Sequence, residues 1–161
     1  MPSLGANFLF SDHTMSKELK VNRKMLLPID GSEASFKTAK YATTIARELN
    51  ASIVLLHVIG IPQFPRYFRS VKEYYEEARK EAEGWFDIIK NLRESKNLQI
   101  TTKIIINAIS VVESIVDYAE KENVDIIIIG TRGRSKFAKL LLGSVTNGVV
   151  TYAKCPVLVV K

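Results

Sequence analysis

Largely apolar runs that alternate with segments of helical periodicity constrain the fold of this chain more than any other feature. A run that is apolar at successive positions is typical of a strand covered on both faces. Parallel neighbours need crossover connections, so the alternation predicts a five-stranded parallel α/β sheet with helices on both faces. The expected strands are Met25–Ile29, Ile53–Val58, Leu98–Ile106, Val124–Ile129 and Pro156–Val160.

Serines mark the starts of three of the expected helices. Ser32 and Ser144 can each cap a helix through the side-chain oxygen, and Ser110 with Glu113 forms a capping box. Between the second and third strands, apolar and aromatic residues recur at helical spacing. This pattern predicts a core-facing helix surface made of Val71, Tyr74, Tyr75, Ala78, Ala82, Trp85, Phe86 and Ile89.

Length and composition favour one compact domain. The chain has 161 residues, of which 47% are hydrophobic, enough for a substantial core. Residues 1–20 lack sustained periodicity and are expected to form a flexible tail, with the domain at 21–161. No apolar run approaches the roughly 18 residues of a membrane span, no secretory signal opens the chain, and Cys155 is the single cysteine. We therefore expect a cytoplasmic protein.

The net charge favours anionic ligands but does not decide between phosphates and nucleic acid. Lysine and arginine number 23 against 17 aspartates and glutamates, for a net charge of +6. Such an excess attracts phosphates and can support weak contact with nucleic acid. The basic residues are spread along the chain and accompany no nucleic-acid motif, so binding of DNA or RNA is not favoured.

A glycine pattern follows the fourth strand and carries the clearest chemical signal. Gly130, Gly133 and Gly143, the last followed by Ser144, are spaced as G-x2-G-x9-G-S between a strand and a helix. Glycine lets backbone N–H groups approach a phosphate closely, and a helix start adds its dipole and free donors. The hydroxyls of Ser144 and Thr146 are further candidate donors. In isolation these glycines could equally build turns, but their order and context favour a phosphate site.

The glycine pattern resembles that of the ATP-binding members of the universal stress protein family. The similarity extends from about Lys24 to Lys161 and includes the segments 26–32 and 154–160. The resemblance implies an adenine nucleotide alpha-hydrolase-like fold, with a doubly wound sheet of order 3-2-1-4-5, which periodicity alone leaves open. It also implies a homodimer through Val157–Val160, and ATP with Mg²⁺ or Mn²⁺ coordinated by the phosphates.

The resemblance also assigns roles to individual residues, which would bind in the crevice beside the first and fourth strands. The segment Pro28, Ile29 and Asp30 would line the adenosine, and the Val58 backbone would recognise adenine. The ribose would be flanked by Ile129, Gly130 and Thr131. The phosphates would be held by Gly133, Gly143, Ser144, Val145 and Thr146, with Arg132 as a candidate cation. A role without ligand contact remains open for two of them: Asp30 could hydrogen-bond only to neighbouring backbone, and the Arg132 side chain could be solvated.

Three functions follow from this sequence. The first is an ATP-binding sensor or regulator in a stress response, in which occupancy orders the loop 133–143 and hydrolysis is slow or absent. The second is a nucleotide-free interaction protein of the same fold, and the third is a weak ATPase. The chain has no G-x4-G-K-[ST] loop, and no metal-ligand cluster or catalytic residue is assigned. His57, inside a buried strand, is expected to be a core histidine.

Overall fold

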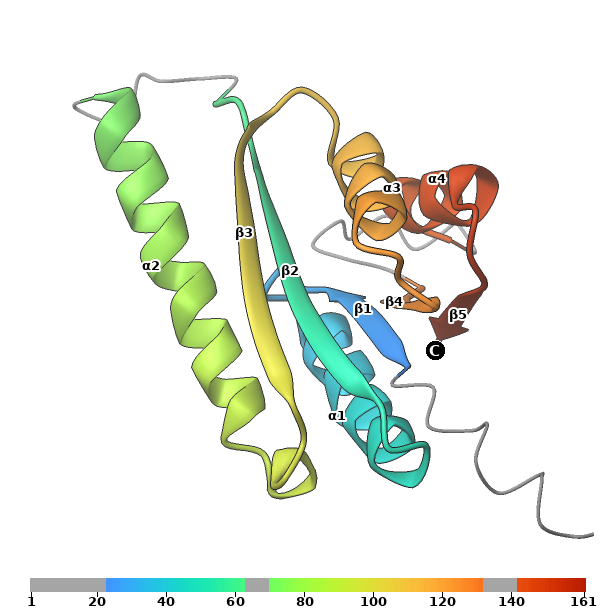
Figure 1. Ribbon diagram of the computed structural model, residues 1–161. Helices are drawn as coiled ribbons and strands as arrows, with labels where there is room; N and C mark the ends of the chain where they lie inside the picture. The colour runs from blue at the N-terminus through green and yellow to red at the C-terminus, as the bar shows by residue number, and fades with distance from the viewer. Residues whose placement is uncertain (1–22, 63–69, 132–141) are drawn as a thin grey trace, which may run out of the picture.

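The computed structural model describes residues 23–62, 70–131 and 142–161. They form a sheet with helices on both faces (Figure 1). The strands are β1 (Lys24–Pro28), β2 (Ser52–Gly60), β3 (Ile100–Ala108), β4 (Ile126–Gly130) and β5 (Val157–Val160). The helices are α1 (Glu33–Glu48), α2 (Val71–Lys90), α3 (Val111–Lys121) and α4 (Ser144–Tyr152), with a short 3₁₀ helix η2 (Arg93–Ser95). None of the helices in these ranges is long and apolar enough to cross a membrane.

The five strands are parallel and lie in the order β3-β2-β1-β4-β5, which confirms the predicted doubly wound sheet. The chain winds from β1 outward to β3, then returns to the other side of β1. The winding therefore reverses between β1 and β4, the place where ligands bind in open sheets of this kind.

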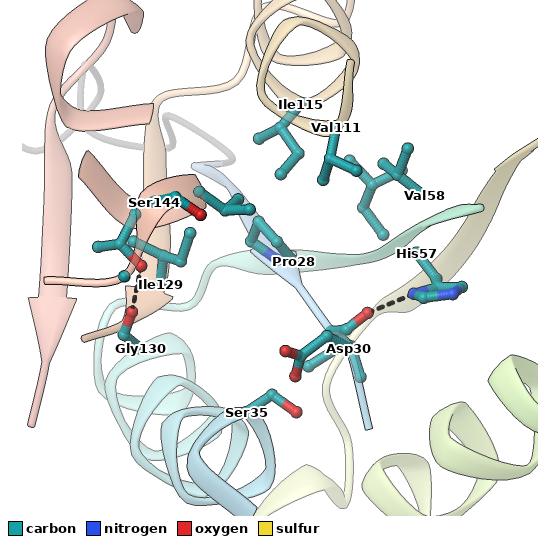
Figure 2. Close-up of a pocket in the computed structure, with 15 residues that line it drawn as sticks. Pro28, Asp30, Ser35, His57, Val58, Val111, Ile115, Ile129, Gly130 and Ser144 are labelled. Atoms are coloured by element: carbon teal, nitrogen blue, oxygen red, sulfur yellow. Dashed lines mark hydrogen bonds between the residues drawn. The ribbon is translucent and has the colours of Figure 1, made fainter. Parts of the chain in front are cut away.

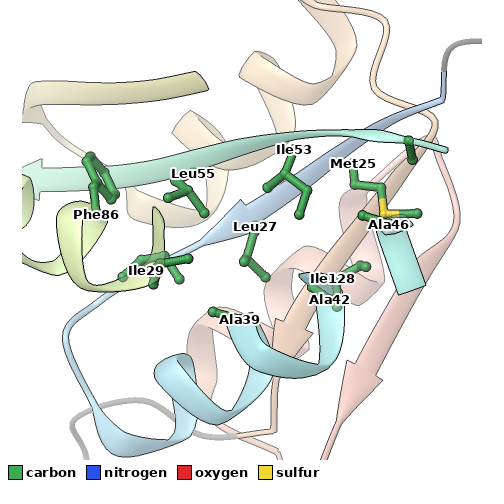
Figure 3. Packing of buried hydrophobic residues seen from close by; sticks show 12 residues of the cluster. Met25, Leu27, Ile29, Ala39, Ala42, Ala46, Ile53, Leu55, Phe86 and Ile128 are labelled. Carbon is green, nitrogen blue, oxygen red and sulfur yellow. The ribbon is translucent and has the colours of Figure 1, made fainter. Parts of the chain in front are cut away.

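Each face of the sheet has its own core. On one face α1 and α2 cover the odd-numbered residues of β1 and β2, including Leu27 and Leu55, which are fully buried (Figure 3). On the other face α3 and α4 cover Leu26 and Leu56. Successive side chains of a strand point to opposite faces, so a continuous apolar run supplies both cores at once.

Several predicted boundaries are confirmed and some are wrong. Ser32 and Ser110 cap α1 and α3, each accepting a hydrogen bond from the backbone N–H three residues on. The N-cap of α4 is Gly143, and Ser144 is its first helical residue, so Ser144 is not the cap. The third strand begins at Ile100 instead of Leu98, because the Leu98 N–H still bonds the Ser95 carbonyl in the turn after η2, and the strand continues to Ala108.

The aromatic surface of α2 faces the core only in part. Ala82, Phe86 and Ile89 are buried, whereas Trp85 is half-buried and Val71 is exposed. The first turn of this helix still reaches β2, because the Tyr74 hydroxyl donates to the Gly60 carbonyl at 3.5 Å.

Candidate functional site

A cavity of about 340 Å³ lies at the carboxyl ends of β1 and β4. Its volume is within the range of sites for small molecules, which are mostly apolar with a few convergent polar groups. Most of its walls here are apolar, and the polar side chains come from the β1–α1 turn, α1, β2 and α4 (Figure 2). It is lined by Pro28, Ile29, Asp30, Ser35, Leu56, His57, Val58, Val111, Ile115, Ile129, Gly130, Gly143, Ser144, Val145 and Thr146.

The turn after β1 holds the Asp30 carboxylate at one wall of the cavity. Its Oδ1 accepts hydrogen bonds from the Ser32 backbone N–H at 3.0 Å and from the Ser32 hydroxyl at 2.6 Å. The Ser32 hydroxyl oxygen in turn accepts from the Ser35 N–H and caps α1. Asp30 thus bonds neighbouring backbone, as the alternative interpretation held, and also lines the cavity, as the resemblance implied.

The opposite wall is apolar and combines a strand with a helix. Val58 of β2 lies beside Val111 and Ile115, which belong to the first two turns of α3 (Figure 2). Planar heterocycles with apolar faces suit such a wall, since burial of those faces is favourable. The wall leaves polar recognition to backbone groups at the rim.

The start of α4 differs from the starts of the other three helices. A serine caps each of α1, α2 and α3, and an acidic residue stands in each first turn: Glu33, Glu73 and Glu113. The Gly143 cap of α4 makes no side-chain hydrogen bond, and its first turn holds no acidic residue. The N–H groups of a first helical turn have no partner within the helix, and they carry the positive end of its dipole. This start opens on the cavity and carries no carboxylate in its own first turn.

Backbone and side-chain hydrogen bonds fix the start of α4 to the end of β4. The Gly143 N–H donates to the Thr131 carbonyl at 2.8 Å, and the Thr131 N–H donates to the Val160 carbonyl at 2.9 Å. The buried Thr146 hydroxyl donates to the Gly130 carbonyl at 2.7 Å. In this arrangement the hydrogen of the Thr146 hydroxyl is engaged inside the protein, and its donation to a phosphate stays a prediction.

Glycine at position 143 is not required by its backbone angles. Its φ of −66° and ψ of 157° are available to any residue. Among the described glycines, the positive φ belongs to Gly31 at 76°. Backbone conformation therefore gives no reason for glycine at position 143, whereas close approach of a ligand to its backbone does.

Most of the expected site residues meet at this cavity. Ten of them line it: Pro28, Ile29, Asp30, Val58, Ile129, Gly130, Gly143, Ser144, Val145 and Thr146. Thr131 lies next to it as the partner of Gly143. Arg132 and Gly133 lie outside the described residues.

Sequence reasoning missed five lining residues. Val111 and Ile115 come from α3, whose place over β1 and β2 depends on the sheet order. Leu56 and Ser35 were not singled out, although each adjoins a predicted element of the site. His57 is half-buried and lines the cavity, so the core-histidine prediction is only partly right. Its position next to Val58 was the available signal.

Two further observations bear on the chemistry of the site. Among residues 23–62, 70–131 and 142–161, no three histidine, cysteine, aspartate or glutamate side chains cluster as they would to hold a metal ion. Cys155 lies outside the cavity lining, and burial raises the pKa of its thiol, which opposes thiolate chemistry at neutral pH.

The sequence profile of the universal stress protein family matches residues 22–161. The chain belongs to the universal stress protein family. Universal stress protein MJ0531 of Methanocaldococcus jannaschii is 33% identical over 144 residues, covering 86% of this chain and 82% of its own length. YxiE of Bacillus subtilis is also 33% identical, over 86% of this chain and 98% of its own.

Solved structures of other proteins share the fold of this universal stress protein. The structure of MJ0577, also from M. jannaschii, superposes with a TM-score of 0.73 at 31% identity, covering 87% of this chain and 96% of that one. UspA of Lactobacillus plantarum has a TM-score of 0.73 at 22% identity, over 87% of this chain and 98% of its own. At that lower identity the likeness concerns the fold alone.

Proposed function

We propose that this universal stress protein is an ATP-binding sensor or regulator in a stress response, with slow or no ATP hydrolysis. The observation that carries the proposal is the start of α4, which has neither a side-chain cap nor an acidic residue and opens on the cavity beside β1. Such a helix start binds anions through its free N–H groups and dipole. Nucleotide occupancy would change a surface or a dimer that partner proteins recognise.

The cavity offers a matching environment to each part of ATP. Adenine would lie against Val58, Val111 and Ile115, and the ribose between Asp30 and the Ile129–Thr131 segment. The phosphates would reach the backbone of residues 143–146 and, beyond the described residues, Arg132 and Gly133. The apolar wall would thus contact the adenine ring, and backbone N–H donors would contact the negatively charged phosphates.

Two solved proteins of the same fold support an adenine nucleotide as the ligand class. One universal stress protein is a complex with cAMP, with a TM-score of 0.61 at 24% identity. Another, from Archaeoglobus fulgidus, is a complex with dAMP, with a TM-score of 0.62 at 21% identity. Their likeness to this chain is one of fold, and the donors at α4 are what extend the argument to a polyphosphate.

A divalent ion would bind together with the nucleotide. The described residues provide no cluster of three acidic or histidine side chains, so Mg²⁺ or Mn²⁺ would take its oxygen ligands mainly from the phosphates and water. The ion would neutralise part of the phosphate charge at the helix start.

The alternatives are a nucleotide-free interaction protein and a weak ATPase. The glycine pattern and the anion-compatible start of α4 favour ligand binding over the first. For the second, Asp30 is the one carboxylate that lines the cavity among the described residues, and its Oδ1 is already bonded to Ser32. A general base must reach the attacking water in a suitable geometry. A carboxylate held by Ser32 does not favour this role, so ATP hydrolysis is the weaker alternative.

Calorimetry with ATP, ADP and AMP tests the proposal directly. We expect measurable binding that weakens as phosphates are removed, because the helix start interacts with the polyphosphate. If none of the three nucleotides gives a measurable heat of binding, nucleotide binding is rejected and the interaction protein is favoured. Release of phosphate over hours in the presence of Mg²⁺ would identify the weak ATPase. Mass spectrometry of small molecules released from the purified protein would show the nucleotide held in cells.

A further inference from the structure

Strand β2 continues beyond the end of its neighbour β1. The two strands pair from Lys24 with Ser52 to Pro28 with Leu56, and β2 then runs on to Gly60. The Ile29 N–H donates to the Leu56 carbonyl at 2.8 Å, so the backbone groups of Leu56 face β1. Backbone groups alternate in direction along a strand. Those of Val58, two residues on, therefore face the same side, where β1 has ended and the cavity begins.

The next rung of this parallel ladder is missing. If the ladder continued, the Val58 N–H would donate to the Ile29 carbonyl. Across the described β1–β2 segments no such bond forms. The Ile29 carbonyl instead contacts Nδ1 of His57 at 2.6 Å (Figure 2). A carbonyl oxygen only accepts hydrogen bonds, so Nδ1 carries the hydrogen.

The His57 ring is also held by packing on the far face of the sheet. Neighbouring residues of a strand point to opposite faces, so His57 lies on the α2 side and Val58 on the α3 side. The His57 and Trp85 rings pack edge to face, with centroids 5.1 Å apart and planes at 90°. Trp85 thus helps to fix the orientation in which Nδ1 reaches Ile29.

We propose that His57 is a positioning residue for recognition of the nucleobase. By holding the Ile29 carbonyl toward the α2 face of the sheet, it stops the β1–β2 ladder one rung early and leaves the Val58 N–H and carbonyl facing the cavity. This donor–acceptor pair matches N1 and the N6 amino group of adenine, whereas guanine presents an acceptor and a donor in the reversed order. A mismatched edge leaves polar groups unpaired, so the pair discriminates between the bases. The inference rests on the proposed nucleotide function.

The test compares ATP and GTP affinity in three variants. His57→Phe keeps a ring against Trp85 and removes the donor, so Val58 can close the ladder onto Ile29. We expect the ratio of ATP to GTP affinity to fall about tenfold. His57→Asn places an amide N–H near the position of Nδ1 and should restore most of the ratio. His13→Phe alters the second of the chain's two histidines, far from the site in sequence, and should leave the ratio unchanged.

The outcomes separate this inference from the proposed function. If wild-type protein binds neither nucleotide, the proposed function and the role of His57 both fail. If it prefers ATP and His57→Phe retains that preference, the role of His57 alone is overturned. Should His57→Phe not fold, ¹⁵N spectra of the wild-type imidazole decide the matter: a protonated Nδ1 supports the inference, and an unprotonated Nδ1 refutes it.

Discussion

Gly31 lies directly against the indole ring of Trp85. A Cβ added at position 31 would be 2.4 Å from two ring carbons, and the φ of this residue is +76°. The turn that carries Asp30 into the cavity is thus formed where only glycine is free of both steric clash and backbone strain. The contact also links α2, at the back of the sheet, to the end of β1.

Gly31→Ala should destabilise the protein by about 1–3 kcal/mol, because alanine is strained at this φ and clashes with Trp85. Urea unfolding measures the loss. Gly84→Ala is the matched control: Gly84 lies in α2, where an added Cβ would meet no atom within 4 Å, and this change should raise stability by about 0.5–1 kcal/mol. Equal effects of the two substitutions would show that the Trp85 contact has no importance.

Thr146→Val should also lower stability, by about 1–3 kcal/mol, because the buried Gly130 carbonyl would lose the hydroxyl that bonds it. Thr146→Ser keeps the hydroxyl and isolates the effect of the methyl group. Chemical denaturation of both variants provides the comparison. If valine and serine are equally stable, the Thr146–Gly130 hydrogen bond does not hold α4 to β4.

Ser144→Asp should change stability and binding in opposite directions. A carboxylate in the first turn of α4 interacts favourably with the helix dipole, which is worth about 0.3–1 kcal/mol. The same charge repels phosphates, so ATP affinity should fall about tenfold at low salt and less at high salt. Thermal unfolding and calorimetry measure the two effects, with Ser144→Asn as the uncharged control. Unchanged ATP affinity would place the phosphates elsewhere.

Gly143→Val and Gly133→Val should each abolish ATP binding without unfolding the protein. The backbone angles of Gly143 suit valine, so the expected effect is obstruction of the ligand and not strain. Gly143→Ala adds only a Cβ and should weaken binding less. Circular dichroism checks the fold, and calorimetry checks affinity. Wild-type affinity in both valine variants would remove the glycine segment from the site.

The strands and two of the three predicted helix caps could be predicted because they depend on local patterns, whereas the order of the strands in the sheet was implied by the family resemblance alone. Apolar runs such as Ile126–Ile129 identify strands covered on both faces, and Ser110 with Glu113 identifies a cap. The start of α4 was misassigned because Ser144 follows a glycine that can also serve as N-cap. The local sequence pattern does not distinguish Ser110, which is an N-cap, from Ser144, which is the first residue of its helix.

The site was only partly predictable because it combines residues from separate crossovers. The glycine pattern and the end of β1 were found from sequence, and both line the cavity. Val111 was missed because its place depends on how α3 packs over β2. His57 was expected in the core because its strand is apolar; its bond to the Ile29 carbonyl and its packing on Trp85 involve two segments that are distant from it in the sequence.

The open edge of β5 motivates a prediction about assembly. Val160 accepts from Thr131, and Pro156 accepts from Ile127, so the even-numbered residues of β5 face β4. Val157 and Val159 therefore direct their backbone groups away from the sheet. An exposed apolar edge of this kind can pair with a second copy of itself, and we expect a homodimer formed through Val157–Val160.

Val159→Pro should convert this homodimer to a monomer while the fold is kept. Proline removes an outward-facing N–H, which the β4–β5 ladder does not use, and so blocks pairing at the open edge. Val159→Ala retains that N–H and should remain dimeric. Leu158→Pro removes an N–H that faces β4 and should destabilise the monomer itself. Light scattering at micromolar concentration, alongside circular dichroism, distinguishes the variants. A wild-type monomer, or a Val159→Pro protein that stays dimeric, would exclude edge-to-edge pairing through β5.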